Sequence, residues 1–166
     1  MLRSLILRTI NSQFIVYLLR CIIGFLIGWV LINKFTEFDL FWALLSIILV
    51  ISPEENQAKQ LTIDRFKSNF LGSISGLAVY FIPLDNIYKV ILGIILTGIL
   101  CRIFSLLNVA RSAVVALLII VIEQGGNYMA PVIRFSTTAI GCFIGLGVTL
   151  VTSTLIQDIN KNLSKE

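Results

Sequence analysis

The stretch "RFKSNFLGSISG" (Arg65–Gly76) decides the fold, because "RFSTTAIGCFIG" (Arg134–Gly145) repeats its pattern later in the chain. Each copy begins with an Arg-Phe pair and carries two glycines at an i, i+4 spacing in an apolar run. The segments "WALLSIILVI" (Trp42–Ile51) and "SAVVALLIIV" (Ser112–Val121) also align without gaps, in nearly the same register. Repetition at a fixed period indicates a repeat architecture. We therefore expect two copies of one structural unit.

The composition around these segments is that of a protein within a bilayer. Hydrophobic residues make up 57% of the chain, charged residues only 13%, and the mean hydropathy is +0.96, which lies far outside the usual range of soluble domains. Backbone groups in hydrocarbon must be satisfied within the spanning structure, and the apolar runs lack the alternation of barrel strands. The sequence therefore predicts an all-α membrane protein with six transmembrane helices, at 14–33, 38–52, 66–83, 86–104, 110–123 and 131–156.

The positions of the repeated motifs predict how the six helices are related. Arg65 is expected to begin the third helix and Arg134 the sixth, so each copy contains three helices. Because three crossings return the chain to the opposite face, the sequence predicts two inverted three-helix repeats. The predicted parts are an amphipathic N-terminal lead-in (1–13), a transmembrane domain (14–156) and a short cytoplasmic tail (157–166).

Two of the predicted helices, the second and the fifth, are short. Each has about 15 apolar residues, roughly 22 Å of helix against about 30 Å of hydrocarbon. Short segments at matching positions of inverted repeats are typical of a translocation site. The alternative is that polar flanking residues complete both helices and that the bilayer thins slightly around them.

The basic residues predict the orientation of the chain. With the N-terminus inside the cell, all of the thirteen Lys and Arg residues except Lys34, Lys89 and Arg134 lie on the cytoplasmic side, as the positive-inside rule requires. We therefore expect a multi-pass protein of the inner membrane, surrounded by lipid, with both termini cytoplasmic. The basic residues form no continuous stripe, so a nucleic acid is not expected as a partner.

Arginines in the apolar segments are the candidate ligand-binding residues, because a guanidinium group keeps its charge and is costly in hydrocarbon. Arg65 and Arg134 are each followed, one turn on, by a hydrogen-bonding side chain, Asn69 and Thr138. A helix N-terminus favours anions, so these four residues are predicted to bind a small organic anion. Arg20, one turn inside the first helix, is a further candidate. The alternative is that the arginines anchor the helices at the headgroups.

Three of the apolar segments carry glycine pairs at an i, i+4 spacing, which lets helix backbones approach closely. We expect these glycines to pack helices together and to support self-association of the chain. The residues are Gly24 and Gly28, Gly72 and Gly76, and Gly141 and Gly145.

Reactive groups for catalysis are scarce in the sequence. The chain has no His, and its three Cys residues lie singly within apolar runs, where Cys behaves as a small buried hydrophobe. No pairing of a nucleophile with a base and no metal-ligand spacing can be named. We therefore expect no enzyme activity, no cofactor and no metal.

The two longest motif-bearing runs are "FWALLSIILVISPEENQAKQLTIDRFKSNFLGSISG" (41–76) and "IRFSTTAIGCFIGLGV" (133–148). They resemble the fusaric acid resistance and aromatic acid exporter family, which is distantly similar to the plant aluminium-activated malate channels. The positions that match are Trp42-Ala43, Pro53, Arg65 with Gly72, and Arg134 with Gly141. Ser68 and Asn69 stand where the family has Gly-Thr.

The resemblance implies a permease or channel that exports small organic anions, with aromatic carboxylates as substrates, and that forms a homodimer. A second class of function fits the same residues. In that alternative the chain is a non-transporting membrane module that packs against other proteins, and its arginines only fix the topology.

Overall fold

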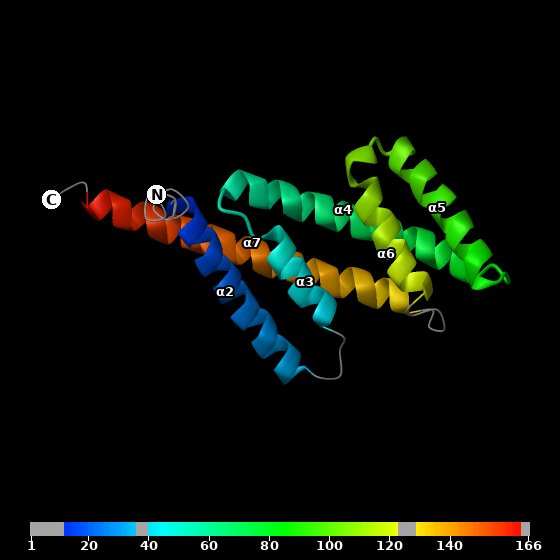
Figure 1. Cartoon of the computed structure of the whole chain (residues 1–166), viewed down its shortest axis with the longest axis horizontal. Coiled ribbons are helices and arrows are strands. Elements are labelled where there is room, and N and C mark those ends of the chain that lie inside the picture. Colours follow the sequence, from blue (N-terminus) through cyan, green and yellow to red (C-terminus); the bar gives the residue numbers. More distant parts are fainter. Residues whose placement is uncertain (1–11, 36–39, 123–128, 164–166) are drawn as a thin grey trace, which may run out of the picture. The chain divides into compact units, whose positions relative to one another are not determined.

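The computed structural model describes residues 12–35, 40–122 and 129–163, which are almost entirely helical and contain no strand (Figure 1). The all-α prediction is confirmed for these residues, whereas most of the predicted lead-in at 1–13 lies outside them. The helices are α2 (Ser12–Lys34), α3 (Phe41–Val50), α4 (Glu55–Tyr80), α5 (Asn86–Ile103), α6 (Ala110–Ile122) and α7 (Ala130–Leu163), with a 3-10 turn (Leu107–Val109) before α6.

Among the described helices, α2, α5 and α7 are long and apolar enough to cross a membrane, over residues 13–34, 86–103 and 130–158. The helices α3 and α6 have only 10 and 13 residues, so both are short as predicted, and α3 is shorter than the predicted segment at 38–52. Several long apolar helices in one chain are the pattern of a multi-pass membrane protein.

The predicted start of the third helix was wrong. The helix α4 begins at Glu55, well before the predicted start at Phe66, because the segment after Pro53 is rich in good helix formers that are also polar. Proline ends the preceding structure, and Glu55 in the first turn complements the helix dipole. Arg65 consequently lies near the middle of α4 and not at a helix N-terminus.

The chain divides into two compact units. Unit 1 contains residues 1–62 and 140–166, and unit 2 contains residues 63–139. The division falls within α4 and within α7, so each of these helices contributes to both units. Unit 1 otherwise contains α2 and α3, and unit 2 contains α5 and α6.

In unit 1, glycines bring α2 and α7 against the short helix α3. A Cβ atom at Gly24 would lie 2.9 Å from the side chain of Ile47, and a Cβ atom at Gly145 would lie 2.7 Å from the Ile47 backbone oxygen. Gly28 faces Leu44, and Gly141 faces the backbone of Ala43. At Gly141 and Gly145 the nearest neighbouring atoms are backbone atoms of α3, so the close approach of α7 to α3 requires glycine there, whereas Gly24 and Gly28 meet the ends of side chains.

In unit 2, α4 and α5 pack in the same way against α6. A Cβ atom at Gly72 would lie 2.6 Å from the Ala113 carbonyl oxygen, and one at Gly93 would lie 2.8 Å from the side chain of Leu117. Gly76 faces Ile120. The glycine pairs named from the sequence therefore all face another helix of their own unit. Self-association of the chain stays a prediction, and it would have to use other surfaces.

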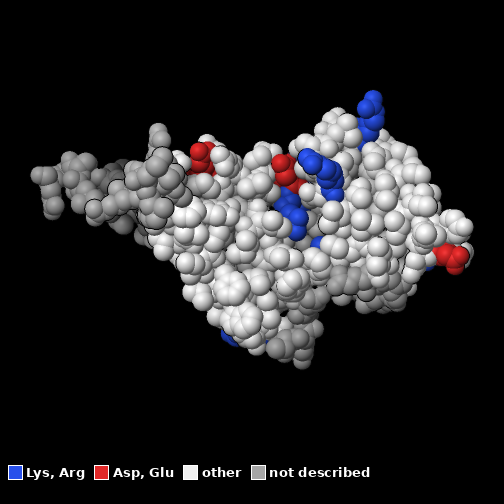
Figure 2. Space-filling view, in the orientation of Figure 1, with Lys and Arg blue, Asp and Glu red and all other residues white. Residues whose placement is uncertain are grey.

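The surface of the described residues is largely apolar, whereas several buried positions are polar. Figure 2 shows few charged side chains on the visible face, and Leu19, Val30 and Ile95 are all more than half exposed. Buried hydroxyl groups return hydrogen bonds to the preceding turn, as Thr97 does to the Gly93 oxygen and Ser75 to the Leu71 oxygen. An apolar exterior around a partly polar interior is the arrangement that lipid favours.

The end of α5 places the residues that follow it close to α6. Ser105 has a positive φ of 55°, the Leu106 amide donates to the Cys101 oxygen at 2.7 Å, and the Ser105 amide donates to the Arg102 oxygen at 3.1 Å. These bonds form a Schellman motif, which caps a helix and reverses the chain. The reversal leads directly into the 3-10 turn and α6.

Candidate functional site

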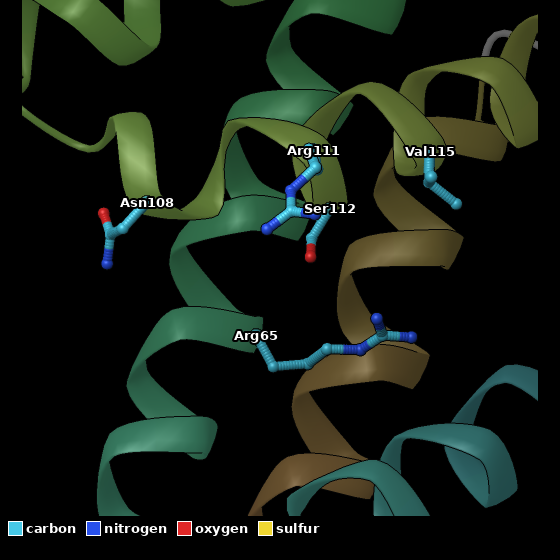
Figure 3. Close-up of a pocket in the computed structure, with 5 residues that line it drawn as sticks. All are labelled: Arg65, Asn108, Arg111, Ser112 and Val115. Atoms are coloured by element: carbon cyan, nitrogen blue, oxygen red, sulfur yellow. The ribbon is translucent and has the colours of Figure 1, made fainter.

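A cavity of about 350 Å³ in unit 2 is lined by Arg65, Asn108, Arg111, Ser112 and Val115. Arg65 comes from α4, Asn108 from the 3-10 turn, and the other three residues from α6. Figure 3 shows Arg111 and Ser112 pointing from α6 toward the level of the Arg65 side chain, with Asn108 and Val115 on opposite sides of them. Two arginines, one asparagine and one serine are therefore among the residues that line the cavity.

The register of α4 against α6 explains why these residues meet. Gly72 faces Ala113 and Ala116, and Gly76 faces Ile120, so the two helices run in the same direction where they pack. Arg65 lies two turns before Gly72 in α4. Residues 108–112 lie just before Ala113, so they are beside Arg65 along the shared direction of the two helices. The position of Arg65 in the cavity thus follows from the glycine contacts.

Sequence reasoning identified Arg65 but missed Asn108, Arg111 and Ser112. The local sequence of Arg111 fits an interfacial anchor, because nothing in it distinguishes this residue from Arg102. The available signal was the pair of small residues Ala113 and Ala116, which can receive a glycine face. Matching them to Gly72 would have brought Arg111 to the level of Arg65.

Asn69 and Thr138 lie together in unit 2, and their described hydrogen bonds are to protein atoms. Thr138 Oγ1 donates to Asn69 Oδ1 at 3.4 Å, and Asn69 Nδ2 donates to the Arg65 backbone oxygen at 3.0 Å. The rings of Phe66 and Phe135, each three residues before a member of this pair, have centroids 5.0 Å apart. The hydrogen bond between Thr138 and Asn69 joins the α4 and α7 segments of unit 2. The second bond of Asn69 connects this pair to the backbone of Arg65.

Arg134 is the fifth residue of α7 and only 2% exposed. The helix begins within one residue of the predicted start, so Arg134 lies near the beginning of its helix as predicted, unlike Arg65, and just beyond the four free N–H groups. Thr137, one turn on, donates to the oxygens of Ile133 and Arg134. Arg134 is not among the residues that line the cavity with Arg65.

Arg20, which is 2% exposed, lies in unit 1 and is held by four hydrogen bonds. Its Nε donates to Thr152 Oγ1 and its Nη2 to Ser153 Oγ, both at 2.8 Å. Its Nη1 donates to the backbone oxygens of Ser52 at 2.6 Å and Pro53 at 2.9 Å. The guanidinium group thus ties α2, α7 and the segment after α3 together, and it satisfies carbonyl groups just beyond the end of that short helix.

The packing contacts also reveal a correspondence that local sequence comparison missed. Gly24 of α2 and Gly93 of α5 both face the same position of the short helices, Ile47 in α3 and Leu117 in α6. When Gly24 is matched to Gly93, Arg20 corresponds to Lys89, whose ammonium nitrogen lies 5.9 Å from the centroid of the Tyr80 ring. Gly24 and Gly93 therefore make the same kind of contact with the short helix of their own unit.

Within the described residues, no three His, Cys, Asp or Glu side chains are grouped so that they could hold a metal ion. The two arginines of the cavity can only donate hydrogen bonds, whereas the side chains of Asn108 and Ser112 can both donate and accept. No acidic side chain is among the lining residues. Such a set can bind an anion but is poorly suited to a cation.

Comparison with known proteins agrees with the resemblance in the motifs. The model of the fusaric acid resistance protein-like family matches residues 21–148, and the chain belongs to this family. No curated protein and no solved structure matches the chain. The family indicates a membrane transport-related function.

Proposed function

We propose that this member of the fusaric acid resistance protein-like family is an inner-membrane permease or channel that exports small organic anions. The family supports transport in general. The observation that carries the choice of an anion is the cavity in unit 2, where Arg65 and Arg111 share walls with Asn108 and Ser112. Two permanently charged residues in the lining of one cavity favour a negative occupant.

The energetics of anion export require little from the protein. An inside-negative membrane potential drives an anion outward by about 2.3 kcal/mol per charge for each 100 mV. Export of an anion can therefore proceed without a coupling ion. For such export, the protein needs only a site whose affinity is high enough to select an anion and low enough to release it.

We also propose that all six helices cross the membrane and form two inverted three-helix repeats. Each unit uses the same packing, because Gly72 meets Ala113 as Gly141 meets Ala43. A two-fold axis between inverted copies brings a residue together with its own counterpart wherever the axis passes. Asn69 with Thr138 and Phe66 with Phe135 are pairs of corresponding residues when the two Arg-Phe motifs are aligned, and their contacts within unit 2 support the proposed repeat.

The test of the proposed function is anion flux through purified protein in liposomes. With a potential imposed and both benzoate and succinate tried, we expect the wild type to carry a small organic anion outward, Arg65→Gln to lower the flux at least about tenfold, and Arg65→Lys to restore it only in part. Arg102→Gln, which removes an exposed charge of the same unit outside the cavity, is the matched control. Absence of flux for all anions tried, from monodisperse protein, would reject transport.

The second candidate function is a non-transporting membrane module. Arg20 favours it, because this arginine has a structural role and the other arginines could have one too. Its four hydrogen bonds end on protein oxygens. In that candidate Arg65 and Arg111 only anchor the chain at the headgroups. Lysine would then replace Arg65 without loss, and flux would not depend on either arginine.

The proposed orientation has its own test in cells. The cavity-lining residues lie on the cytoplasmic side if both termini are cytoplasmic. A single cysteine replacing Asp85, which is exposed between α4 and α5, should react with an impermeant maleimide from outside, and one replacing the exposed Gln57 should not. The reverse labelling pattern would invert the topology.

A further inference from the structure

We propose that Arg111, Asn108 and Ser112 complete, together with Arg65, a receptor for a small oxyanion that carries two negative charges, and that only one of the two repeats has such a receptor. This inference rests on the proposed function, because it names the class of substrate and the residues that select it. It differs from the expectation of aromatic monocarboxylates.

The charge of the cavity favours a dianion. Both arginines stay protonated at any physiological pH, and both are among the residues that line the same space of about 350 Å³. Two carboxylates on one molecule can interact with both cations at close range, whereas a monoanion can do so fully with only one. The volume is near the lower limit for small-molecule sites, so the ligand is compact.

The donors that complete the receptor are not used elsewhere in the described structure. The side chains of Asn108, Arg111 and Ser112 make no hydrogen bond or ion pair with another described residue. In contrast, Ser68 and Asn69 of the adjacent α4 donate to the Arg65 backbone oxygen. Polar side chains that are already exposed and directed into a cavity can bind a ligand without first breaking internal bonds.

The walls of the cavity are poorly suited to an aromatic ring. Val115 is the one apolar side chain among its five lining residues, whereas sites for drug-sized apolar ligands are lined mainly by hydrophobic and aromatic side chains. A ligand with two charged groups and a short apolar linker fits this lining. The linker would lie near Val115 and the charged groups near Arg65 and Arg111.

The corresponding positions of the other repeat lack the second cation. In the gap-free alignment of the second and fifth segments, Arg111, Ser112 and Val115 correspond to Phe41, Trp42 and Leu45. Arg134 is the counterpart of Arg65, but no basic residue corresponds to Arg111. Within the two aligned segments the paired cations therefore occur in one copy alone, and we expect one bound dianion per chain.

The experiment measures equilibrium binding of two four-carbon acids, radiolabelled succinate and butyrate, to purified protein in phosphatidylcholine nanodiscs. We expect one succinate per chain, bound at least about tenfold more tightly than butyrate, because each charge-assisted contact contributes on the order of tenfold in affinity. Arg111→Gln should lower succinate affinity about tenfold or more and butyrate affinity less than about threefold. Arg102→Gln, at an exposed position outside the cavity, should change neither.

The possible outcomes separate this inference from the proposed function. Equal affinity of the wild type and Arg111→Gln for succinate, or equal affinity of succinate and butyrate, overturns the inference even if anion flux is measured. Binding that depends on Arg111 without any flux supports the receptor and rejects transport. If phosphatidylglycerol in the nanodiscs abolishes succinate binding, the cavity holds a lipid headgroup and the inference is wrong.

Discussion

Arg20 in unit 1 and Arg111 in unit 2 are both arginines of largely apolar helices, but their surroundings differ in kind. Arg20 is surrounded by oxygens, with hydroxyl groups of Thr152 and Ser153 and two backbone carbonyls within 2.6–2.9 Å of its nitrogens. Arg111 instead lines a cavity together with a second cation, Arg65. Oxygen acceptors compensate a guanidinium group, whereas another cation nearby raises the positive potential of the space between them.

This difference shows how two arginines of one membrane protein can be assigned opposite roles. A charged group in a bilayer is costly, so its cost must be offset by partners within the protein, by water and headgroups, or by a ligand. The four acceptors of Arg20 offset the cost internally and make it a structural tie. The side chain of Arg111 makes no hydrogen bond or ion pair with a described residue, so its full hydrogen-bonding capacity is open to a ligand.

The largest expected effect follows from breaking the tie at Arg20. Arg20→Gln removes a buried hydrogen-bonding group and leaves the carbonyls of Ser52 and Pro53 unsatisfied, at a cost of about 3 kcal/mol. For a chain of this size that corresponds to roughly 6–12 °C in melting temperature. The measurement is thermal unfolding of the purified protein in detergent, followed by loss of monodispersity.

The control for Arg20 is Arg102→Gln, at an exposed position that makes no described hydrogen bond through its side chain. Its melting temperature should stay within about 2 °C of the wild type. If Arg20→Gln melts like the wild type but loses anion binding, Arg20 is a ligand, and the contrast between Arg20 and Arg111 is wrong.

A smaller effect is expected at the glycine contacts, which both units share. Gly72→Ala places a methyl group 2.6 Å from the Ala113 oxygen and 2.7 Å from the Ala116 Cβ, and such overpacking costs about 1–3 kcal/mol. Gly98 lies in α5 with nothing within 4 Å of its Cβ position. Gly98→Ala should therefore be neutral or stabilise by up to about 1 kcal/mol.

The same pair of substitutions exists in unit 1. Gly145→Ala meets the Ile47 backbone at 2.7 Å, and Gly147, further along α7, has nothing within 4 Å. Thermal unfolding of all four variants should therefore separate Gly72 and Gly145 from Gly98 and Gly147. Equal stability of the two classes would mean that α3 and α6 are not packed on these glycines.

Much of this architecture could be predicted from the sequence, because it depends on periodic apolar runs and on small residues. The second and fifth helices are short, as predicted, although α3 is shorter than the segment predicted for it. Gly72 and Gly141 face neighbouring helices, as their spacing indicates. The start of α4 was not predicted, because residues 55–64 are polar and the prediction assigned helix only to apolar segments. A helix needs good helix formers and a start signal, and both lie directly after Pro53.

The candidate site was less accessible to sequence reasoning, because it depends on which helix each glycine face meets. Local sequence favours Arg65, Arg134 and Arg20 alike. Only the contacts separate them, since Arg20 meets oxygens and Arg65 shares a cavity with Arg111. Arg111 is remote from Arg65 along the chain, and only tertiary packing brings them together.

The smallest expected effect concerns Thr138, which sequence reasoning placed in the anion site. Its hydroxyl donates to Asn69 Oδ1 at 3.4 Å, a long hydrogen bond between two helix segments of unit 2. Interhelical hydrogen bonds in membrane proteins contribute about 0.6 kcal/mol on average, so Thr138→Val should lower the stability by less than about 1 kcal/mol. Thr154→Val, at an exposed position of α7, is the control.

Because the bond of Thr138 is to protein and not to the cavity, succinate affinity should stay within about twofold of the wild type. A tenfold loss of affinity at unchanged melting temperature would instead make Thr138 a ligand and move the anion site from the cavity at Arg111 to the link between Asn69 and Thr138.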